Sequence, residues 1–168
     1  MSRLARLADR LGAMAFAASP ALQRLWARRR VTWSTDVPWA PPPRSLAATT
    51  VALVTTAGVH LDTDPPFDLD AREGDPTFRR IPRDVDRRRL VVSHGHYDSR
   101  DVRRDVNVVL PLDRLEELAA AGRIGGVAPV HYGFGWIRDV APLVGETAPV
   151  VARELVAARV GAVVLTPA

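Results

Sequence analysis

Each of the four histidines in this chain stands at or just beyond the end of a short apolar run that predicts a β-strand. The histidines and their runs are His60 after residues 51–54, His94 and His96 after residues 90–92, and His131 at the end of residues 127–130. An imidazole can transfer protons near neutral pH or bind a metal ion. Open α/β proteins hold their sites at the carboxyl ends of parallel strands. If these strands are parallel, the histidines mark one candidate site along a sheet edge.

Residues 94–98 (HGHYD) suggest a metal site first. Residues two apart in an extended chain point to the same side, so His94, His96 and Asp98 can converge on one ion, with His131 as a further ligand. The segment resembles the HxHxDH turn of the metallo-β-lactamase superfamily, except that Ser99 stands where the last histidine is needed. A metal-dependent hydrolase is therefore one alternative. Another is that these side chains only satisfy backbone groups at strand ends.

Strands and helices alternate along the body of the chain. The expected strands span residues 50–56, 77–81, 89–93, 127–131 and 162–166, and the expected helices run from residue 112 to Gly122 and over residues 148–158. This order predicts an α/β fold with a parallel or mostly parallel sheet and flanking helices. Pro82 stops the strand at 77–81, which we expect at a sheet edge.

The N-terminal segment differs from the rest in charge and pattern. Residues 1–30 carry seven arginines and a single acidic residue, whereas residues 31–168 carry 16 arginines and 18 acidic residues. Apolar residues three and four apart predict a basic N-terminal helical arm over residues 1–30, packed on its own domain or on a partner. Contact with an anionic membrane and a cleaved signal peptide are less favoured alternatives. Prolines make residues 31–49 a stiff linker, and residues 50–168 form the α/β domain.

Composition excludes several classes of function. The chain has no cysteine, so no thiolate metal site or disulfide can form within it. No apolar run approaches the roughly 20 residues that span a bilayer. The positive charge belongs to the arm alone, so we expect no nucleic acid as a partner. The glycines at 122–126 lack the spacing of a dinucleotide or phosphate cradle.

A series of motifs resembles a known family, the selenoprotein B family of glycine, sarcosine, betaine and D-proline reductases. The matching segments, in order, are residues 55–61 (TTAGVHL), 64–68 (DPPFD), 74–82 (GDPTFRRIP), 94–98 (HGHYD), 105–107 (DVN), 111–115 (PLDRL), 122–125 (GRIG) and 131–135 (HYGFG). The resemblance covers about two thirds of the chain, from Val51 to Pro167, and leaves out residues 1–44.

The resemblance implies a bacterial oxidoreductase that cleaves a small amine or imino acid reductively. The family places its selenocysteine or cysteine after the strand that corresponds to residues 162–165, and here only Thr166, Pro167 and Ala168 follow. We expect that this reading frame was ended at a UGA selenocysteine codon, or was otherwise cut short there, so the chain is truncated and lacks the redox residue. A naturally short, non-catalytic relative is the alternative. No separate cofactor is expected.

The histidines are then expected to support the redox step. His94, His60 and His131 are candidates to donate protons or to bind a carboxylate of the substrate. Asp98 is expected to orient a histidine or the backbone of a turn. The candidate substrate contacts are Tyr97, Asn107 and His96. We expect a cytoplasmic protein with a small-molecule substrate, and a protein partner or second copy bound through residues 1–30. A non-catalytic partner subunit is a further hypothesis.

Overall fold

The computed structural model describes residues 18–21, 24–25, 40–95 and 97–167. The chain divides into two compact units, Met1–Ala40 and Pro41–Ala168. In the first unit residues 20–21 and 24–25 are helical, and the rest of the predicted arm lies outside the described residues, as do residues 31–39 of the predicted linker. Among the described residues, no helix is both long and apolar enough to cross a membrane.

The second unit alternates strands and helices. Its strands are β1 (Thr50–Thr55), β2 (Val59–Leu61), β3 (Phe78–Pro82), β4 (Leu90–Val92), β5 (Gly126–Val127), β6 (Val130–Phe134) and β7 (Ala162–Thr166). Its helices are α3 (Arg100–Arg104), α4 (Leu112–Ala120) and α5 (Ala148–Ala157), with short helical turns η1 (Leu46–Ala48), η2 (Arg87–Arg89), η3 (Val106–Val108) and η4 (Leu143–Thr147).

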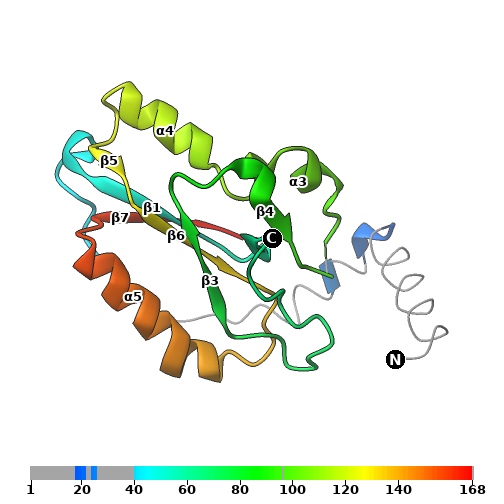
Figure 1. Ribbon diagram of the computed structural model, residues 1–168. Coiled ribbons are helices and arrows are strands. Elements are labelled where there is room, and N and C mark those ends of the chain that lie inside the picture. Colours follow the sequence, from blue (N-terminus) through cyan, green and yellow to red (C-terminus); the bar gives the residue numbers. More distant parts are fainter. Residues whose placement is uncertain (1–17, 22–23, 26–39, 96, 168) are drawn as a thin grey trace. The chain divides into compact units, whose positions relative to one another are not determined.

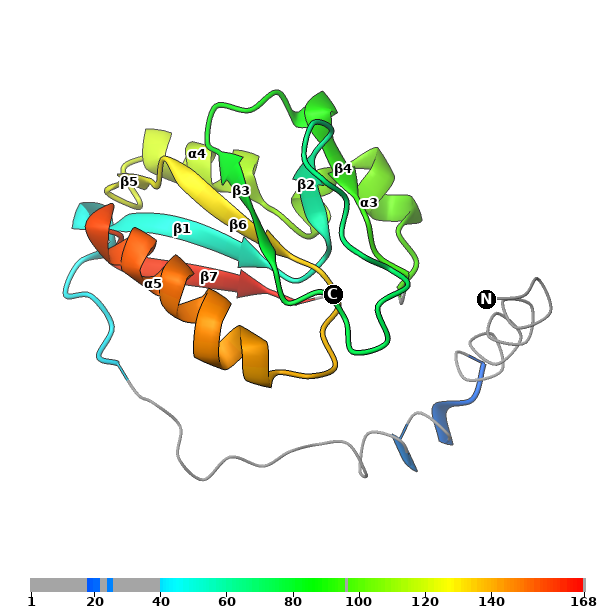
Figure 2. The ribbon, with the colours of Figure 1, turned by 60° about the horizontal axis from the view of Figure 1, so that its bottom comes forward.

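The main sheet is mostly parallel, which confirms the predicted α/β class. Strand β1 lies at its centre and pairs in parallel with β5, β6 and β7. Strand β3 pairs antiparallel with β6 at one edge, as expected for a strand with arginines and a closing proline. Because β1, β6 and β7 run in the same direction, their carboxyl ends lie together at one end of the sheet (Figure 2). We call this end the sheet edge.

Helices α4 and α5 cover opposite faces of this sheet (Figures 1 and 2). On the α4 face, Leu53 of β1 packs with Leu112 and Leu115, all at or near full burial. On the α5 face, Tyr132 and Phe134 of β6 pack with Val151. Alternate residues of a strand point to opposite faces, so β1 contributes Leu53 to the first core and Val54 to the second.

Two helix ends show how local sequence ends these elements. Gly122 adopts a φ of +65° after α4, and the following N–H of Arg123 donates to the Leu118 carbonyl over 2.9 Å. This confirms the predicted stop at Gly122. After α5 the left-handed position falls on Arg159, with a φ of 55°, and Val160 N–H donates to the Leu155 carbonyl over 3.0 Å.

The strand predicted at residues 89–93 forms, but its expected place in the parallel sheet was wrong. Its structural counterpart, β4, does not join the main sheet; it pairs antiparallel with β2 in a separate two-stranded ribbon, with His60 opposite Val91. Strand β2 itself lies in a segment for which no strand was expected. The ribbon packs its apolar residues on the α4-side core. His94 therefore reaches the sheet edge from this ribbon and not from a parallel strand.

Candidate functional site

The carboxyl ends of β1, β6 and β7 meet at the turn formed by residues 56–58. The N–H of Thr56 donates to the Thr166 carbonyl of β7 over 3.1 Å, and the N–H of Gly58 donates to the Phe134 carbonyl of β6 over 2.8 Å. Ala57, between them, is fully buried. One short turn thus joins three parallel strand ends, the location at which open α/β sheets hold their sites.

Gly58 allows the β2–β4 ribbon to lie directly against this turn. Its φ is +71°, and a Cβ at this position would lie 2.2 Å from the Ser93 carbonyl oxygen and 3.2 Å from the Cβ of His94. The N–H of Ser93 donates to the Gly58 carbonyl over 2.9 Å. Only glycine fits a left-handed position with backbone this close. The glycine therefore sets His94 beside the strand ends.

His60 is 3% exposed, and both of its ring nitrogens are engaged. The Nδ1 atom lies 2.7 Å from the Leu61 carbonyl, which can only accept, so Nδ1 carries the proton. The Nε2 atom then accepts from the Ser93 hydroxyl over 2.8 Å. The ring of Phe67 packs edge-on against the imidazole at 5.8 Å. In this arrangement His60 holds Ser93 and the ribbon in place.

His94 and Tyr97 form the more accessible part of the site. Their ring centroids lie 4.5 Å apart, and both side chains are half-buried. The Tyr97 hydroxyl donates to the Ala57 carbonyl over 3.0 Å, which ties it to the turn at the strand ends. Burial raises the pKa of Tyr97, so the phenol stays protonated at neutral pH. His94 is thus the half-buried imidazole of the described site.

Asp98 is exposed and does not bond to a histidine in any contact of the described residues. Its carboxylate accepts from the side chain and backbone N–H of Arg100, and these hydrogen bonds lower its pKa. His96, the second histidine of the motif, lies outside the described residues. Among the residues that are described, no three histidine or acidic side chains group closely enough to hold a metal ion. The comparisons below do not favour the hydrolase alternative.

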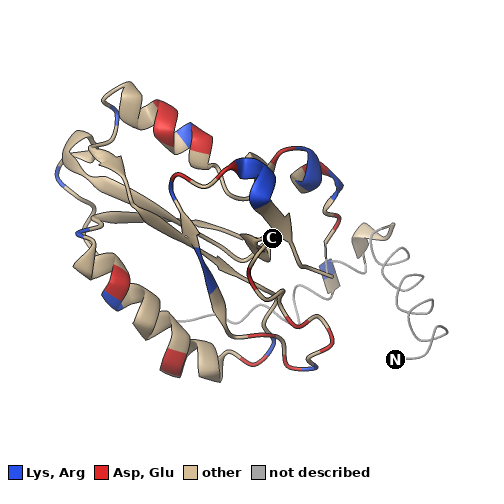
Figure 3. Cartoon of the chain, viewed as in Figure 1, with Lys and Arg blue, Asp and Glu red and all other residues tan. Residues whose placement is uncertain are grey.

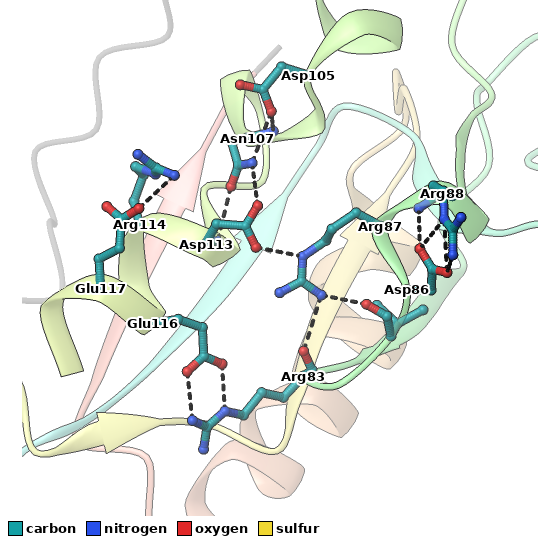
Figure 4. Close-up of polar contacts among 11 residues, drawn as sticks. Arg83, Asp86, Arg87, Arg88, Asp105, Asn107, Asp113, Arg114, Glu116 and Glu117 are labelled. Atoms are coloured by element: carbon teal, nitrogen blue, oxygen red, sulfur yellow. Dashed lines mark hydrogen bonds and ion pairs between the residues drawn. The ribbon is translucent and has the colours of Figure 1, made fainter. Parts of the chain in front are cut away.

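Asn107 lies away from the histidines, in a polar network that links η2, η3 and α4 (Figure 4). Its side-chain oxygen accepts from the Asp113 N–H over 3.0 Å, in the first turn of α4. Its Nδ2 donates to Asp105 over 2.9 Å and to the Asp113 carboxylate over 2.7 Å. The N-cap residue of α4, Pro111, makes no side-chain hydrogen bond to the first turn of the helix. Asn107 supplies an acceptor for one of the N–H groups that this turn leaves unpaired.

His131 is fully buried within the sheet, on the face covered by α4. Its Nδ1 accepts from the Leu53 N–H over 2.9 Å, while Nε2 has no hydrogen-bond partner among the described residues. Burial, with the nearby cations of Arg87 and Arg83 adding to it and Glu116 opposing it, lowers the pKa of His131 to about 4. The imidazole is thus neutral at pH 7 and sits in the core.

The structure adds residues that the sequence motifs did not single out. Ser93 and Phe67 contact His60, and Gly58 sets the approach of the ribbon. Gly133 has a similar role, because a Cβ there would lie 2.0 Å from the Val59 carbonyl oxygen. Gly58 and Gly133 lie within the family-like segments 55–61 and 131–135, Phe67 lies within 64–68, and Ser93 directly precedes 94–98. This placement was the signal that could have found them.

Comparison with known proteins identifies relatives of this chain. Residues 28–168 match the model of the glycine/sarcosine/betaine reductase selenoprotein B family. The D-proline reductase subunit gamma of Acetoanaerobium sticklandii is 43% identical over 129 residues, which are 76% of this chain and 52% of that protein. The glycine reductase complex component B subunit gamma of Carboxydothermus hydrogenoformans is 31% identical over 137 residues, 77% of this chain and 30% of that protein.

The chain spans about half the length of the first relative and less than a third of the second. No solved structure matches it. The family match nevertheless covers most of the chain, including every segment of the turn, ribbon and strand ends described above. The chain belongs to the glycine/sarcosine/betaine reductase selenoprotein B family.

Proposed function

We propose that this chain forms the α/β part of a reductase subunit that takes a small amine or imino acid and cleaves its carbon–nitrogen bond reductively. The main support is the match over residues 28–168, together with relatives named as a D-proline reductase subunit and a glycine reductase component. The relatives' names also support a protein partner, since both are called subunits. A cytoplasmic location stays a prediction.

The reaction needs a redox group that these 168 residues do not contain. Cleavage of a carbon–nitrogen bond to C–H and N–H consumes two electrons and two protons. A selenolate or thiolate with a neighbouring thiol can supply the electrons, ends as a selenosulfide or disulfide, and is re-reduced by a dithiol donor. The chain has no cysteine, so we propose that residues outside this sequence supply the pair.

Within the described residues we assign the proton-donor role to His94. It is the half-buried imidazole beside the turn where β1, β6 and β7 end, and Gly58 sets it there. Tyr97 and His60 act as positioning residues, because the first anchors on the Ala57 carbonyl and the second holds Ser93. His131 and Asn107 serve the framework, since their partners lie within the core and at the start of α4.

The test uses the assembled reductase with its partner subunits, supplied with a dithiol. His94→Gln keeps a hydrogen-bonding side chain but cannot donate an imidazolium proton. We expect kcat for product formation to fall by roughly 10²- to 10⁴-fold and the alkaline limb of the pH–rate profile to change, with unchanged assembly. Arg72→Gln, at a 90% exposed side chain, is the control. Wild-type turnover by His94→Gln would disprove the assignment.

A non-catalytic role in the same complex is the second candidate, and the absence of cysteine favours it. The partner subunits would then hold the whole reaction, and this chain would serve assembly. Loss of assembly without this chain, together with wild-type turnover by His94→Gln in the assembled complex, would support that role. Loss of turnover in His94→Gln without loss of assembly would exclude it. The prediction that residues 1–30 bind the partner is tested by deleting them and measuring assembly.

A further inference from the structure

A cavity of about 460 Å³ opens between β4, α3 and η3, and none of the described histidines is in its lining. Its volume falls within the range of small-molecule sites, about 300–1,000 Å³. The apolar part of its lining includes Leu90 and Val92 of β4, Val102 of α3 and Val106 of η3. None of the described candidate site residues other than Asn107 lines it.

Arginines from two elements form the polar part of the same cavity. They are Arg87 and Arg88 of η2 and Arg103 and Arg104 of α3, whereas the acidic residues of the lining are Asp105 and Asp113. Figure 3 shows that the arginine positions of η2 and α3 lie along the chain close to β4. The lining thus carries four cationic groups against two anionic groups.

The two carboxylates of the lining accept hydrogen bonds from other residues of the same lining (Figure 4). Asp113 accepts from Arg87 Nε over 2.9 Å with one oxygen and from Asn107 Nδ2 over 2.7 Å with the other. Asp105 accepts from the backbone and side chain of Asn107, both over 2.9 Å. Arg87 is further fixed by the Arg83 and Val85 carbonyls. This side of the cavity is therefore preorganised, and its acids are satisfied.

The arginines of α3 have weaker partners. Arg103 donates through Nε to the Ser99 hydroxyl over 3.1 Å and, among the described residues, pairs with no carboxylate. Arg104 lies 3.6 Å from Asp101, with both side chains about 80% exposed. An exposed pair of this kind contributes little binding energy. The α3 side of the cavity therefore presents guanidinium groups that are available to an anion.

We propose that this cavity binds a small organic anion, with its carboxylate or phosphate on Arg103 and Arg104 and its apolar body against β4. A guanidinium presents paired N–H donors that match a carboxylate or phosphate. The apolar lining selects an anion with a hydrocarbon part over an inorganic one. None of the described histidines lines the cavity, so its binding can be tested without turnover by the proposed reaction.

Titration of the isotopically labelled chain, followed by NMR of its backbone amides, tests the proposal. The probes are phenylacetate and phenyl phosphate, which share the apolar body and distinguish the two anions. We expect saturable shifts at Val92, Val102 and Val106 with at least one of them. Phenethylamine, which reverses the charge, and inorganic phosphate, which lacks the apolar body, should cause weaker shifts there.

The double variant Arg103→Gln/Arg104→Gln should raise Kd about tenfold or more, which corresponds to at least 1.4 kcal/mol. Both side chains are exposed, so the fold should survive, and an unchanged spectrum of the free variant verifies this. Arg72→Gln, an exposed arginine away from the cavity, should bind like the wild type. Shifts elsewhere, equal Kd in the double variant, or binding only of an acidic peptide would each overturn the proposal.

Discussion

The backbone N–H of Leu53 donates to Nδ1 of His131 over 2.9 Å, between the neighbouring strands β1 and β6. The strand register explains this contact. Val51 faces Val127, but Val54 faces Tyr132, so two additional residues lie opposite β1 between β5 and β6. Such a bulge interrupts the backbone ladder. The imidazole supplies the acceptor that the ladder lacks there, which gives His131 a structural role in a fully buried position.

The stability of the fold should depend on pH through His131. Its pKa is about 4 in the folded chain and 6.5 when unfolded, so between these values the unfolded chain binds the additional proton. The free energy of unfolding should therefore be highest above pH 6.5 and fall as the pH drops toward 4. The contribution of this group is about 3 kcal/mol over the full range. Urea unfolding at pH 7 and at pH 4.5 measures it.

His131→Leu provides the control for that prediction. The variant should be less stable than the wild type at pH 7 by about 1–3 kcal/mol, because it leaves the Leu53 N–H buried without an acceptor. Its loss of stability between pH 6.5 and 4.5 should be smaller than that of the wild type. Equal losses in the two proteins would show that His131 does not carry the pH dependence.

Gly58→Ala should destabilise the chain far more than Gly122→Ala. Both glycines have positive φ, +71° and +65°, so both substitutions incur the left-handed strain of about 1–2 kcal/mol. A Cβ at Gly58 would also lie 2.2 Å from the Ser93 carbonyl, whereas the space at Gly122 is open. We expect a loss above about 3 kcal/mol at Gly58. Chemical denaturation measures both losses, and similar values would contradict the close approach of the ribbon.

Arg159→Gly should stabilise the chain. Arg159 holds a φ of 55° after α5, where glycine is the preferred residue. We expect the free energy of unfolding to rise by about 1 kcal/mol, because glycine has no Cβ and adopts a left-handed backbone without strain. The arginine side chain is exposed, so its removal costs little packing. Ala158→Gly is the matched control, because Ala158 has a φ of −79° and glycine there only adds unfolded-state entropy. A loss of stability in Arg159→Gly would refute the prediction.

The two tyrosines should resist ionisation while the chain is folded. Burial, together with the hydrogen bond to Glu154, raises the pKa of Tyr132 to about 12, and burial raises that of Tyr97. Absorbance at 295 nm should therefore show less tyrosinate at pH 10.5 in the folded chain than in urea. Because the folded pKa of Tyr132 is the higher one, its contribution to stability is lost as the pH rises from 10 through 12.

Glu154→Gln separates the two causes for Tyr132. The substitution removes the carboxylate that accepts from the Tyr132 hydroxyl over 3.0 Å but leaves the ring buried. The midpoint for Tyr132 should move to lower pH, measured in a Tyr97→Phe background so that one tyrosine remains. An unchanged midpoint would leave burial as the sole cause.

Local patterns were sufficient to predict most of the elements. The apolar runs at 50–56 and 162–166 correspond to β1 and β7, and leucines three apart with a closing Gly122 correspond to α4. These features depend on neighbours within one element, so the periodicity of the sequence carries them. The strand expected at 127–131 is divided into β5 and β6, because the chain bulges at residues 128–129.

The topology around the site depended on contacts that no local pattern specifies. Three residues of β4 could join a parallel sheet or a ribbon, and pairing with β2, some thirty residues earlier, decides in favour of the ribbon. The left-handed glycine at 58 and its contact with Ser93 make that pairing compatible with the sheet edge. Such long-range pairing is a property of the folded chain.

The sequence by itself determined the family and the α/β class. The expected position of the histidines at strand ends was wrong for His60, the middle residue of β2, and for His131, the second residue of β6. Only the tertiary structure decided how deeply the described histidines are buried and which groups they contact. His60 and His131 follow the same kind of apolar run as His94, yet both are buried, with His60 bonded through both nitrogens and His131 through one. His94 stays half-buried beside Gly58 because the ribbon, and not a parallel strand, carries it there. Burial and partners come from residues distant in sequence, and they set whether an imidazole is available for chemistry.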